Sequence, residues 1–310
     1  MLLRRHLNKM DFDILHTPGG LFYLLQNRRK PALIEVYDME LTHDVNPFRL
    51  ALKQRYYSLT GYYHLFRHSL ELAEGVTVEN SEQRKFLLEF CPNIDVRRIY
   101  ELPSSVDVSE VESELAHSQR TRPDLGLETG DFVVISTNRF VRAKGLDVLV
   151  DAFARFRAQV SNSRLVLVGG KGPTGDGIVK QVRDLGLSDS VQIKRSISHS
   201  ELLNYYANSD VYVCPMISGS ASTSIYDAMA SGLPIVSTVM PELVHDGKNG
   251  FLVERGNPDA ITKALCKIYD FNLRNKFGQV SKSIVSEYDS VRVAKRVLHI
   301  YEELSEPRGR

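Results

Sequence analysis

The stretch from Asp210 to Thr238 decides the fold, and it reads DVYVCPMISGSASTSIYDAMASGLPIVST. Its pattern predicts a buried strand over 211–214, a loop of small hydroxylated residues after Pro215, a helix over 222–231 and a second strand over 235–237. A strand, a loop, a helix and a strand in this order form the repeating unit of a parallel α/β sheet. The loop would lie at the carboxyl edge of the sheet, where the unpaired N–H groups that open a helix bind anions. The stretch therefore predicts an α/β fold with an anion site.

The composition is typical of a globular protein with room for two domains. The chain has 310 residues, of which 43% are hydrophobic and 25% are charged. Its 39 basic and 38 acidic side chains leave a net charge of +1, so the bulk charge does not indicate nucleic-acid binding. No run of roughly 18 apolar residues and no signal-peptide core is present, and the three cysteines are too far apart to form a metal site. We expect a reduced, cytoplasmic protein.

Short apolar strands alternate with helical patterns along the chain, which predicts parallel sheets in two domains. Six strands with intervening helices fill residues 131–285 and form a complete doubly wound domain. The polar segment 116–130, which has one proline and two glycines, is the expected linker. Residues 1–115 form the expected first domain, and 286–310 are a last helix and tail, for which packing back on the first domain is one interpretation.

The first domain is short for its type. It offers four or five strands, and no strand with a glycine-rich turn precedes Asp11. A doubly wound domain ordinarily begins with such a strand. The pattern therefore predicts a first domain that is incomplete at its N-terminus.

The segment from Ser136 to Phe153, STNRFVRAKGLDVLVDAF, carries a chemical signal. Arg139 and Lys144 follow a predicted strand, and Gly145 opens the next helix. Two cations beside a helix N-terminus suit a diphosphate, which needs charge-assisted donors and oriented amides. Basic residues in such a loop are more often solvated surface when taken alone, so both interpretations stay open at this point.

Several motifs resemble, in the same order, those of GT-B glycosyltransferases of the family 4 type. NRFVRAKGL is similar to the family pattern G-R-hydrophobic-x-x-x-K-G-hydrophobic, with Asn138 in place of the glycine. DAMASGLPIVST resembles E-A-M-A-x-G-x-P-V-V-A-T, and LVLVGGKGP and HDGKNGFLVERGNPDAITKAL resemble the family segments before and after it. The resemblance covers residues 130–270 and extends weakly into the first half through ALIEVYDME, LAEGVTVENSEQRKFLLE and RRIYELPSSVD.

The resemblance implies an α/β protein of the GT-B fold, in which two Rossmann-like doubly wound domains face a cleft and the N-terminal one is incomplete. It implies that Arg139 and Lys144 bind the diphosphate of a nucleotide-diphospho-sugar donor. The residues implied to contact the donor sugar or nucleotide are Gly169, Gly170, Ser218, Gly219, Ser220, Ser222, Thr223 and Asp227. The nucleotide sugar is a substrate, so no cofactor and no metal are implied.

Four features depart from the family pattern. Gly219 stands at the position of the first donor glutamate, which hydrogen-bonds the sugar, and Asp227 stands at the second, which usually holds the ribose. Tyr37 replaces the family histidine near the donor sugar, and the opening glycine-rich loop has no counterpart. Asp227 as an acid in a first helical turn, Tyr37 as an aromatic at the edge of the core, and the serine-rich loop as a helix cap are the alternative structural interpretations.

No catalytic residue follows from the sequence, and His16 and Tyr37 are the candidates. His16 comes after a predicted strand and before Thr17-Pro18-Gly19-Gly20, where it would face the cleft and an acceptor. A lone histidine in this place is as often structural, so both interpretations stay open.

The segment 45–70 has no Asp or Glu, and it holds four Arg or Lys residues and six aromatic residues. A basic, aromatic helix can lie on an anionic membrane surface. An amphipathic helix whose tyrosines pack on the sheet has the same composition. Peripheral membrane contact and simple packing are therefore both open.

The expected function is transfer of a sugar from a nucleotide-diphospho-sugar to a glycan, lipid or other acceptor in cell-envelope glycan biosynthesis. The resemblance implies metal-independent transfer with retained anomeric configuration. The alternative is an impaired relative that binds a nucleotide sugar or serves as a partner subunit without turnover. Gly219 and the short first domain favour this alternative.

Overall fold

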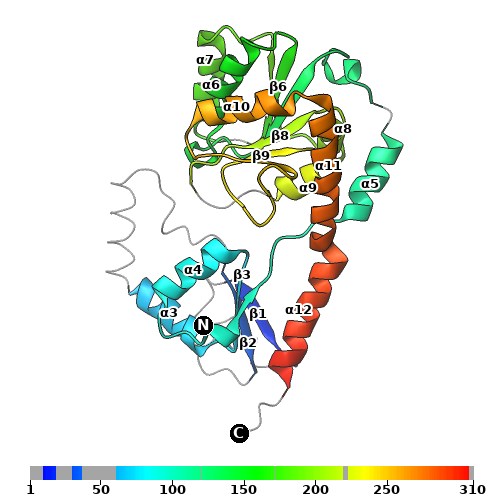
Figure 1. The fold of residues 1–310 in the computed structure, drawn as a ribbon. Coiled ribbons are helices and arrows are strands. Elements are labelled where there is room, and N and C mark those ends of the chain that lie inside the picture. The colour runs from blue at the N-terminus through cyan, green and yellow to red at the C-terminus, as the bar shows by residue number, and fades with distance from the viewer. Residues whose placement is uncertain are drawn as a thin grey trace. The chain divides into compact units, whose positions relative to one another are not determined.

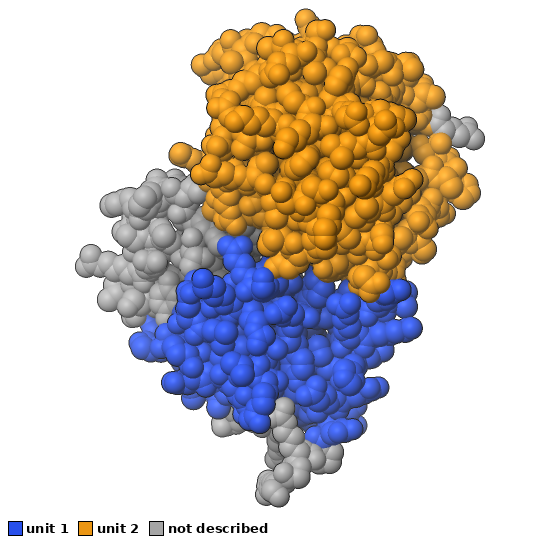
Figure 2. Space-filling view, viewed as in Figure 1, with its two compact units in different colours: residues 1–104, 291–310 blue, residues 105–290 orange. Residues whose placement is uncertain are grey.

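The chain forms two compact units, which are coloured separately in Figure 2. The first comprises residues 1–104 and 291–310, and the second comprises residues 105–290. The computed structural model describes residues 10–18, 30–36, 61–118, 120–170, 172–218 and 223–306. The boundary after residue 104 differs from the expected one after residue 115, because α5 (Val108–His117) packs against helices of the second unit.

The second unit holds a six-stranded parallel sheet in the order β10-β9-β8-β5-β6-β7 (Figure 1). Its strands are β5 (Phe132–Thr137), β6 (Ser163–Gly169), β7 (Val191–Arg195), β8 (Val211–Cys214), β9 (Ile235–Ser237) and β10 (Gly250–Leu252). The order runs outward from β5 through β7 on one side and from β8 through β10 on the other. The strand order therefore reverses between β5 and β8, which are hydrogen-bonded neighbours. In doubly wound sheets, ligands bind outside the carboxyl ends of the strands at such a reversal.

Helices cover both faces of this sheet (Figure 1). They are α6 (Leu146–Arg157), α7 (Gly175–Asp184), α8 (His199–Ala207), α9 (Ser224–Ala230), α10 (Pro258–Ile268) and α11 (Phe271–Val285). Successive residues of β5 point to opposite faces. Val134 lies in the core cluster that α6, α7 and α10 complete, and Val133 lies in the cluster that α8 and α9 complete.

The described part of the first unit is a four-stranded parallel sheet in the order β1-β2-β3-β4. Its strands are β1 (Leu15–Pro18), β2 (Ala32–Glu35), β3 (Gly75–Val78) and β4 (Ile99–Glu101). Apolar residues of α3 (Tyr62–Leu72) and α4 (Ser81–Phe90) form one core cluster with Ile34 of β2. Leu33 points to the opposite face, where it packs with Ile300 and Leu304 of α12 (Ser290–Ser305). Short 3-10 turns lie at Val96–Arg98, Pro123–Leu125, Arg142–Lys144 and Ser286–Tyr288.

One carboxylate ties distant segments of the second unit to its sheet. Asp210, directly before β8, accepts hydrogen bonds at 2.8 Å from both the Arg122 guanidinium and the backbone N–H of Val133. Its other oxygen lies 3.2 Å from Nε of Arg274 on α11. The three side chains are only 12%, 20% and 17% exposed for Asp210, Arg122 and Arg274. Without this carboxylate, two largely buried guanidinium groups would lose their ion-pair partner.

Asp210→Ala is expected to lower the free energy of unfolding by about 3 kcal/mol, because it removes the acid from a mostly desolvated charge cluster. Urea unfolding followed by circular dichroism measures the change. Asp184→Ala is the matched control, because the Lys180–Asp184 pair is 2.7 Å long but its side chains are 75% and 56% exposed. The control should change the stability by less than about 1 kcal/mol. Equal losses in both variants would contradict the role assigned to Asp210.

Candidate functional site

The loops on either side of the strand-order reversal lie against each other. We call residues 138–145 the β5 loop and residues 215–218 the β8 loop. The carbonyl oxygen of Ala143 accepts hydrogen bonds from the backbone N–H groups of Ile217, at 2.9 Å, and Ser218, at 3.2 Å. Both loops leave the carboxyl ends of adjacent strands. The structure therefore brings the two predicted segments of the donor site together.

Gly145 is required for this contact. Its φ angle is +64°, in the left-handed region that glycine adopts without strain. A Cβ atom at this position would lie 1.9 Å from the carbonyl oxygen of Pro215. The glycine after Lys144 therefore permits the close approach of the two loops.

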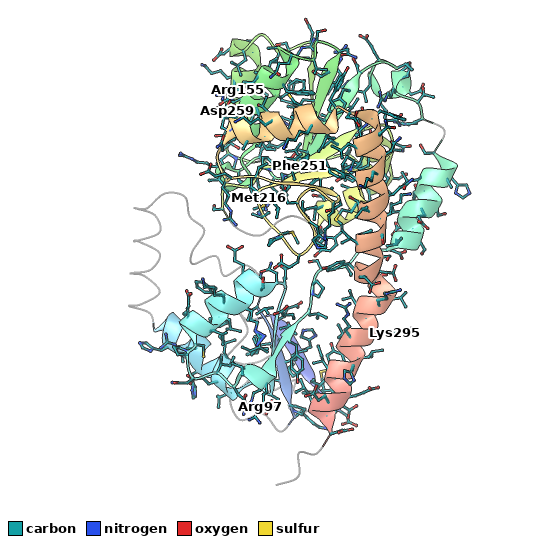
Figure 3. All side chains as sticks on the ribbon, in the orientation of Figure 1. Arg97, Arg155, Met216, Phe251, Asp259 and Lys295 are labelled. Carbon is teal, nitrogen blue, oxygen red and sulfur yellow. The ribbon has the colours of Figure 1, made fainter. Side chains whose placement is uncertain are left out.

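Arg139 and Lys144 lie on the β5 loop, as the sequence predicts. Arg139 is exposed, and Lys144 is half-buried at the end of a 3-10 turn. Nζ of Lys144 lies 3.7 Å from Sδ of Met216, which is labelled in Figure 3. The lysine ammonium therefore lies against the β8 loop, and Arg139 is an exposed residue of the same β5 loop.

Gly169 ends β6, and two of the three glycines at this turn, Gly169 and Gly172, lie close to the β5 loop. A Cβ atom on Gly169 would lie 2.0 Å from the carbonyl oxygen of Asn138, and one on Gly172 would lie 2.1 Å from that of Phe140. Nothing lies within 4 Å of the position of a Cβ atom on Gly170. The sequence predicts close approach to a ligand at this turn, whereas the approach found at Gly169 is to the β5 loop. Gly170 has the open space that a ligand contact would use.

The predicted serine-rich loop is described only at its two ends. Gly219, Ser220 and Ser222 lie outside the described residues, as does Tyr37. Ser218 ends the β8 loop, and the exposed Thr223 directly precedes α9. The helix begins at Ser224 and not at residue 222, and it has seven residues. Such a short helix has few aligned peptide dipoles, so the cations of the β5 loop supply most of the positive charge expected at this edge.

A buried hydroxyl network fixes the start of α9 to the end of β5. Oγ of Ser224 donates to the carbonyl oxygen of Thr137 at 3.0 Å, and the Tyr212 hydroxyl bonds to Oγ of Ser224 at 2.9 Å. The Tyr206 hydroxyl donates to Oγ1 of Thr137 at 2.9 Å. Burial raises the pKa of both tyrosines, so their hydroxyls stay protonated. The sequence patterns do not predict this network, because tyrosines at apolar positions also occur as ordinary core residues.

Asp227 of α9 faces a histidine that the sequence analysis missed. Its Oδ2 atom lies 3.4 Å from Nε2 of His199, the first residue of α8, and its side chain is 19% exposed. Nδ1 of His199 lies 3.8 Å from the carboxylate of Glu110 on α5. Burial raises the pKa of the Asp227 carboxyl, and the neighbouring His199 opposes that shift. No sequence spacing joins these residues, because they come from three different helices.

His16 lies in the first unit, within β1 and not after it. Its Nδ1 atom lies 2.7 Å from the hydroxyl of Tyr301 on α12, and Nε2 lies 3.8 Å from the carboxylate of Glu35. The expected position after the strand is thus corrected, because β1 continues to Pro18. These contacts support the structural interpretation of His16, and its catalytic role stays a prediction.

Two kinds of feature are absent from the described part of the chain. The described residues contain no group of three or more His, Cys, Asp or Glu side chains that would hold a metal ion. None of the described helices has the length and apolar character needed to cross a bilayer.

Comparison with known proteins identifies related enzymes. The family described as "Glycosyl transferases group 1" matches residues 117–283, which is more than half of the chain. The chain is 34% identical over 205 residues to the GDP-mannose-dependent alpha-(1-6)-phosphatidylinositol monomannoside mannosyltransferase of Mycolicibacterium smegmatis, covering 62% of this chain and 52% of that protein. It is 25% identical over 275 residues to the alpha-monoglucosyldiacylglycerol synthase of Streptococcus pneumoniae, covering 84% and 61%. The chain thus spans about half the length of the mycobacterial relative.

Solved structures share the fold. Anabaena HepE in complex with UDP superposes with a TM-score of 0.80 at 18% identity, covering 98% of this chain and 81% of that one. A glycosyltransferase from Rickettsia africae gives a TM-score of 0.78 at 16% identity, covering 99% and 80%. These likenesses confirm the expected GT-B class of α/β fold. By its sequence match, this chain belongs to the glycosyl transferases group 1 family.

Proposed function

We propose that this protein transfers a hexosyl group from a nucleoside-diphospho-sugar to a lipid-linked or glycan acceptor in the synthesis of a cell-envelope glycan. The observation that carries the proposal is the pair of cations, Arg139 and Lys144, on a β5 loop that is held against the β8 loop. This pair lies at the strand-order reversal, where doubly wound sheets bind nucleotides.

The chemistry needs positive charge at this place. When the bond between the sugar C1 atom and the diphosphate oxygen breaks, negative charge grows on the departing nucleoside diphosphate. Arg139 and Lys144 would stabilise that charge, and the backbone contacts of Ala143 would keep the β5 loop in place during the step. Retention of the anomeric configuration and independence of metal stay predictions. Product NMR and assays in excess EDTA test them.

Asp227 is the proposed partner of the nucleotide ribose. Its carboxylate is held at the edge of α9 beside His199, and a carboxylate accepts hydrogen bonds from a diol. Gly170 would allow the donor to approach the backbone, since the space beside it is open. The roles proposed for Asp227 and Gly170, like those of Ser218 and Thr223, come from the family resemblance and are applied to the positions found in the structure.

The relatives support a lipid-linked acceptor. One is named for a phosphatidylinositol monomannoside acceptor and GDP-mannose, and another for the synthesis of a glucosyldiacylglycerol. Helix α3, which begins within segment 45–70 and ends just beyond it, adds an observation, because Leu65 is 43% exposed and Leu72 is 41% exposed. The exposed side chains of His64, Arg67 and His68 lie on the same helix. The exposed leucines and the Arg67 guanidinium suit peripheral contact with an anionic membrane, and Glu71 of the same helix lies 3.9 Å from His68.

A second candidate function is nucleotide-sugar binding without turnover, either alone or as a partner subunit. Gly219 favours it, because a glycine has no side chain to hydrogen-bond the donor sugar. Assays of hydrolysis and of transfer to phosphatidylinositol mannoside and diacylglycerol acceptors distinguish the two candidates. Donor binding without either reaction would favour the second.

Arg139→Ala and Lys144→Ala are each expected to weaken the binding of GDP or UDP about tenfold, because each removes a charge-assisted contact to the diphosphate. Isothermal titration calorimetry measures the dissociation constants. Lys180→Ala removes an exposed cation of α7 that pairs with Asp184, and it should leave the affinity unchanged. Wild-type affinity in both site variants would refute the assigned diphosphate site.

Asp227→Asn is expected to weaken nucleotide binding without lowering the thermal stability. Burial raises the pKa of the Asp227 carboxyl, so the folded state holds this proton more tightly than the unfolded state. The contribution of the group to stability therefore falls as the pH rises through the raised pKa, and at neutral pH the ionised form is destabilising. The variant should unfold at the same temperature as the wild type or higher, yet bind GDP or UDP about tenfold more weakly. A clear fall in the unfolding temperature would contradict this account.

The membrane proposal predicts co-sedimentation with phosphatidylglycerol vesicles but not with phosphatidylcholine vesicles, and weaker binding at high salt. Replacing Leu65 and Leu72 together by serine should lower the partitioning at least about fivefold, because their exposed apolar surface would no longer enter the membrane. Leu185→Ser is the matched control, since Leu185 is 44% exposed in the other unit. Absence of vesicle binding at every salt concentration would refute the proposal.

A further inference from the structure

We propose that His199 is a positioning residue, which aims the carboxylate of Asp227 at the ribose of the bound nucleotide. The inference rests on the proposed function, in which Asp227 binds that ribose. It concerns a histidine that the family resemblance did not single out.

The two carboxylate oxygens of Asp227 differ in their contacts. Oδ2 lies 3.4 Å from Nε2 of His199. Among the residues that the structure describes, the side-chain hydrogen bond found for Asp227 uses Oδ2 and leaves Oδ1 available. A carboxylate whose one oxygen is engaged by a fixed donor keeps the other oxygen in a defined direction, available to a ribose hydroxyl.

His199 is 46% exposed and contacts two carboxylates. Its Nδ1 atom lies 3.8 Å from Oε1 of Glu110, so the ring stands between carboxylates of α5 and α9. The side chain of Ser198 caps α8 by accepting from the backbone N–H of Glu201 at 3.1 Å. Oγ of Ser200 donates to Glu114 of α5 at 2.7 Å. The first turn of α8 is thereby fixed to α5, and the imidazole is presented to Asp227 from a fixed backbone.

A contact between Asp227 and a ribose would depend on a neighbouring donor such as His199 for two reasons. The side chain of aspartate is one methylene shorter than the family glutamate, so its reach depends more on the direction of its carboxylate. Burial alone favours the neutral acid, which has a weaker accepting oxygen. The neighbouring imidazole opposes that effect and favours the ionised form. His199 thus supports both the direction and the charge that a ribose contact requires.

The test compares GDP and UDP with their 2′,3′-dideoxy counterparts by calorimetry in the wild type and in variants. His199→Ala should weaken binding of the ribonucleotide about fivefold, by loss of one oriented hydrogen bond, and leave binding of the dideoxynucleotide unchanged. His199→Gln keeps a neutral N–H donor and should restore part of the loss. His299→Ala removes an exposed histidine of α12 in the other unit, and it should leave the preference for ribose unchanged.

The outcomes distinguish a failure of the role assigned to His199 from a failure of the proposed function. Equal weakening of ribonucleotide and dideoxynucleotide in His199→Ala would show a merely structural role and overturn the inference. Wild-type affinities for both nucleotides in that variant would overturn it as well, while the proposed function would stand. A wild-type protein that binds no nucleoside diphosphate would overturn the proposed function itself, and the inference with it.

Discussion

The contact between the β5 loop and the β8 loop is the constraint on which the rest of the candidate site depends. The strand order reverses between these neighbours, so the two loops extend from adjacent carboxyl ends. Backbone bonds to the Ala143 carbonyl hold the loops together, and Gly145 admits the carbonyl of Pro215. Because these contacts involve the backbone, they place Lys144 against the β8 loop before any ligand binds. Charge that is fixed in advance needs no rearrangement when a diphosphate departs.

The orientation of α9 depends on polar contacts at two places. Its apolar residues pack into the core below, but apolar packing is non-directional and tolerates small rotations of a short helix. The hydroxyl of Ser224 is bonded to the end of β5 and to Tyr212, which fixes the first turn. Asp227, almost one turn later, faces His199 of α8. Satisfied buried networks of this kind specify one arrangement, because each alternative leaves a polar group without a partner.

Local patterns predicted much of this fold, and tertiary contacts explain what they missed. The strands at 211–214 and 235–237 were predicted to the residue, because apolar runs between turn residues are a local signal. Arg139 and Lys144 were predicted at the sheet edge because they follow a strand. The pairing of His199 with Asp227 was not predicted, since it joins two helices. Nor does a glycine pattern say whether a ligand or the chain itself approaches, as Gly169 illustrates.

The departures from the family pattern concern different parts of the donor. Arg139, Lys144 and Asp227 are all assigned to the nucleotide, and these positions keep cations or a carboxylate. Burial raises the pKa of the Asp227 carboxyl, and a perturbed acid is more typical of functional sites than of the surface. Gly219, in contrast, replaces the glutamate that the resemblance assigns to the sugar. Under the proposed assignments, the positions for the nucleotide keep their charged groups, whereas the substitution at Gly219 would affect contacts with the sugar.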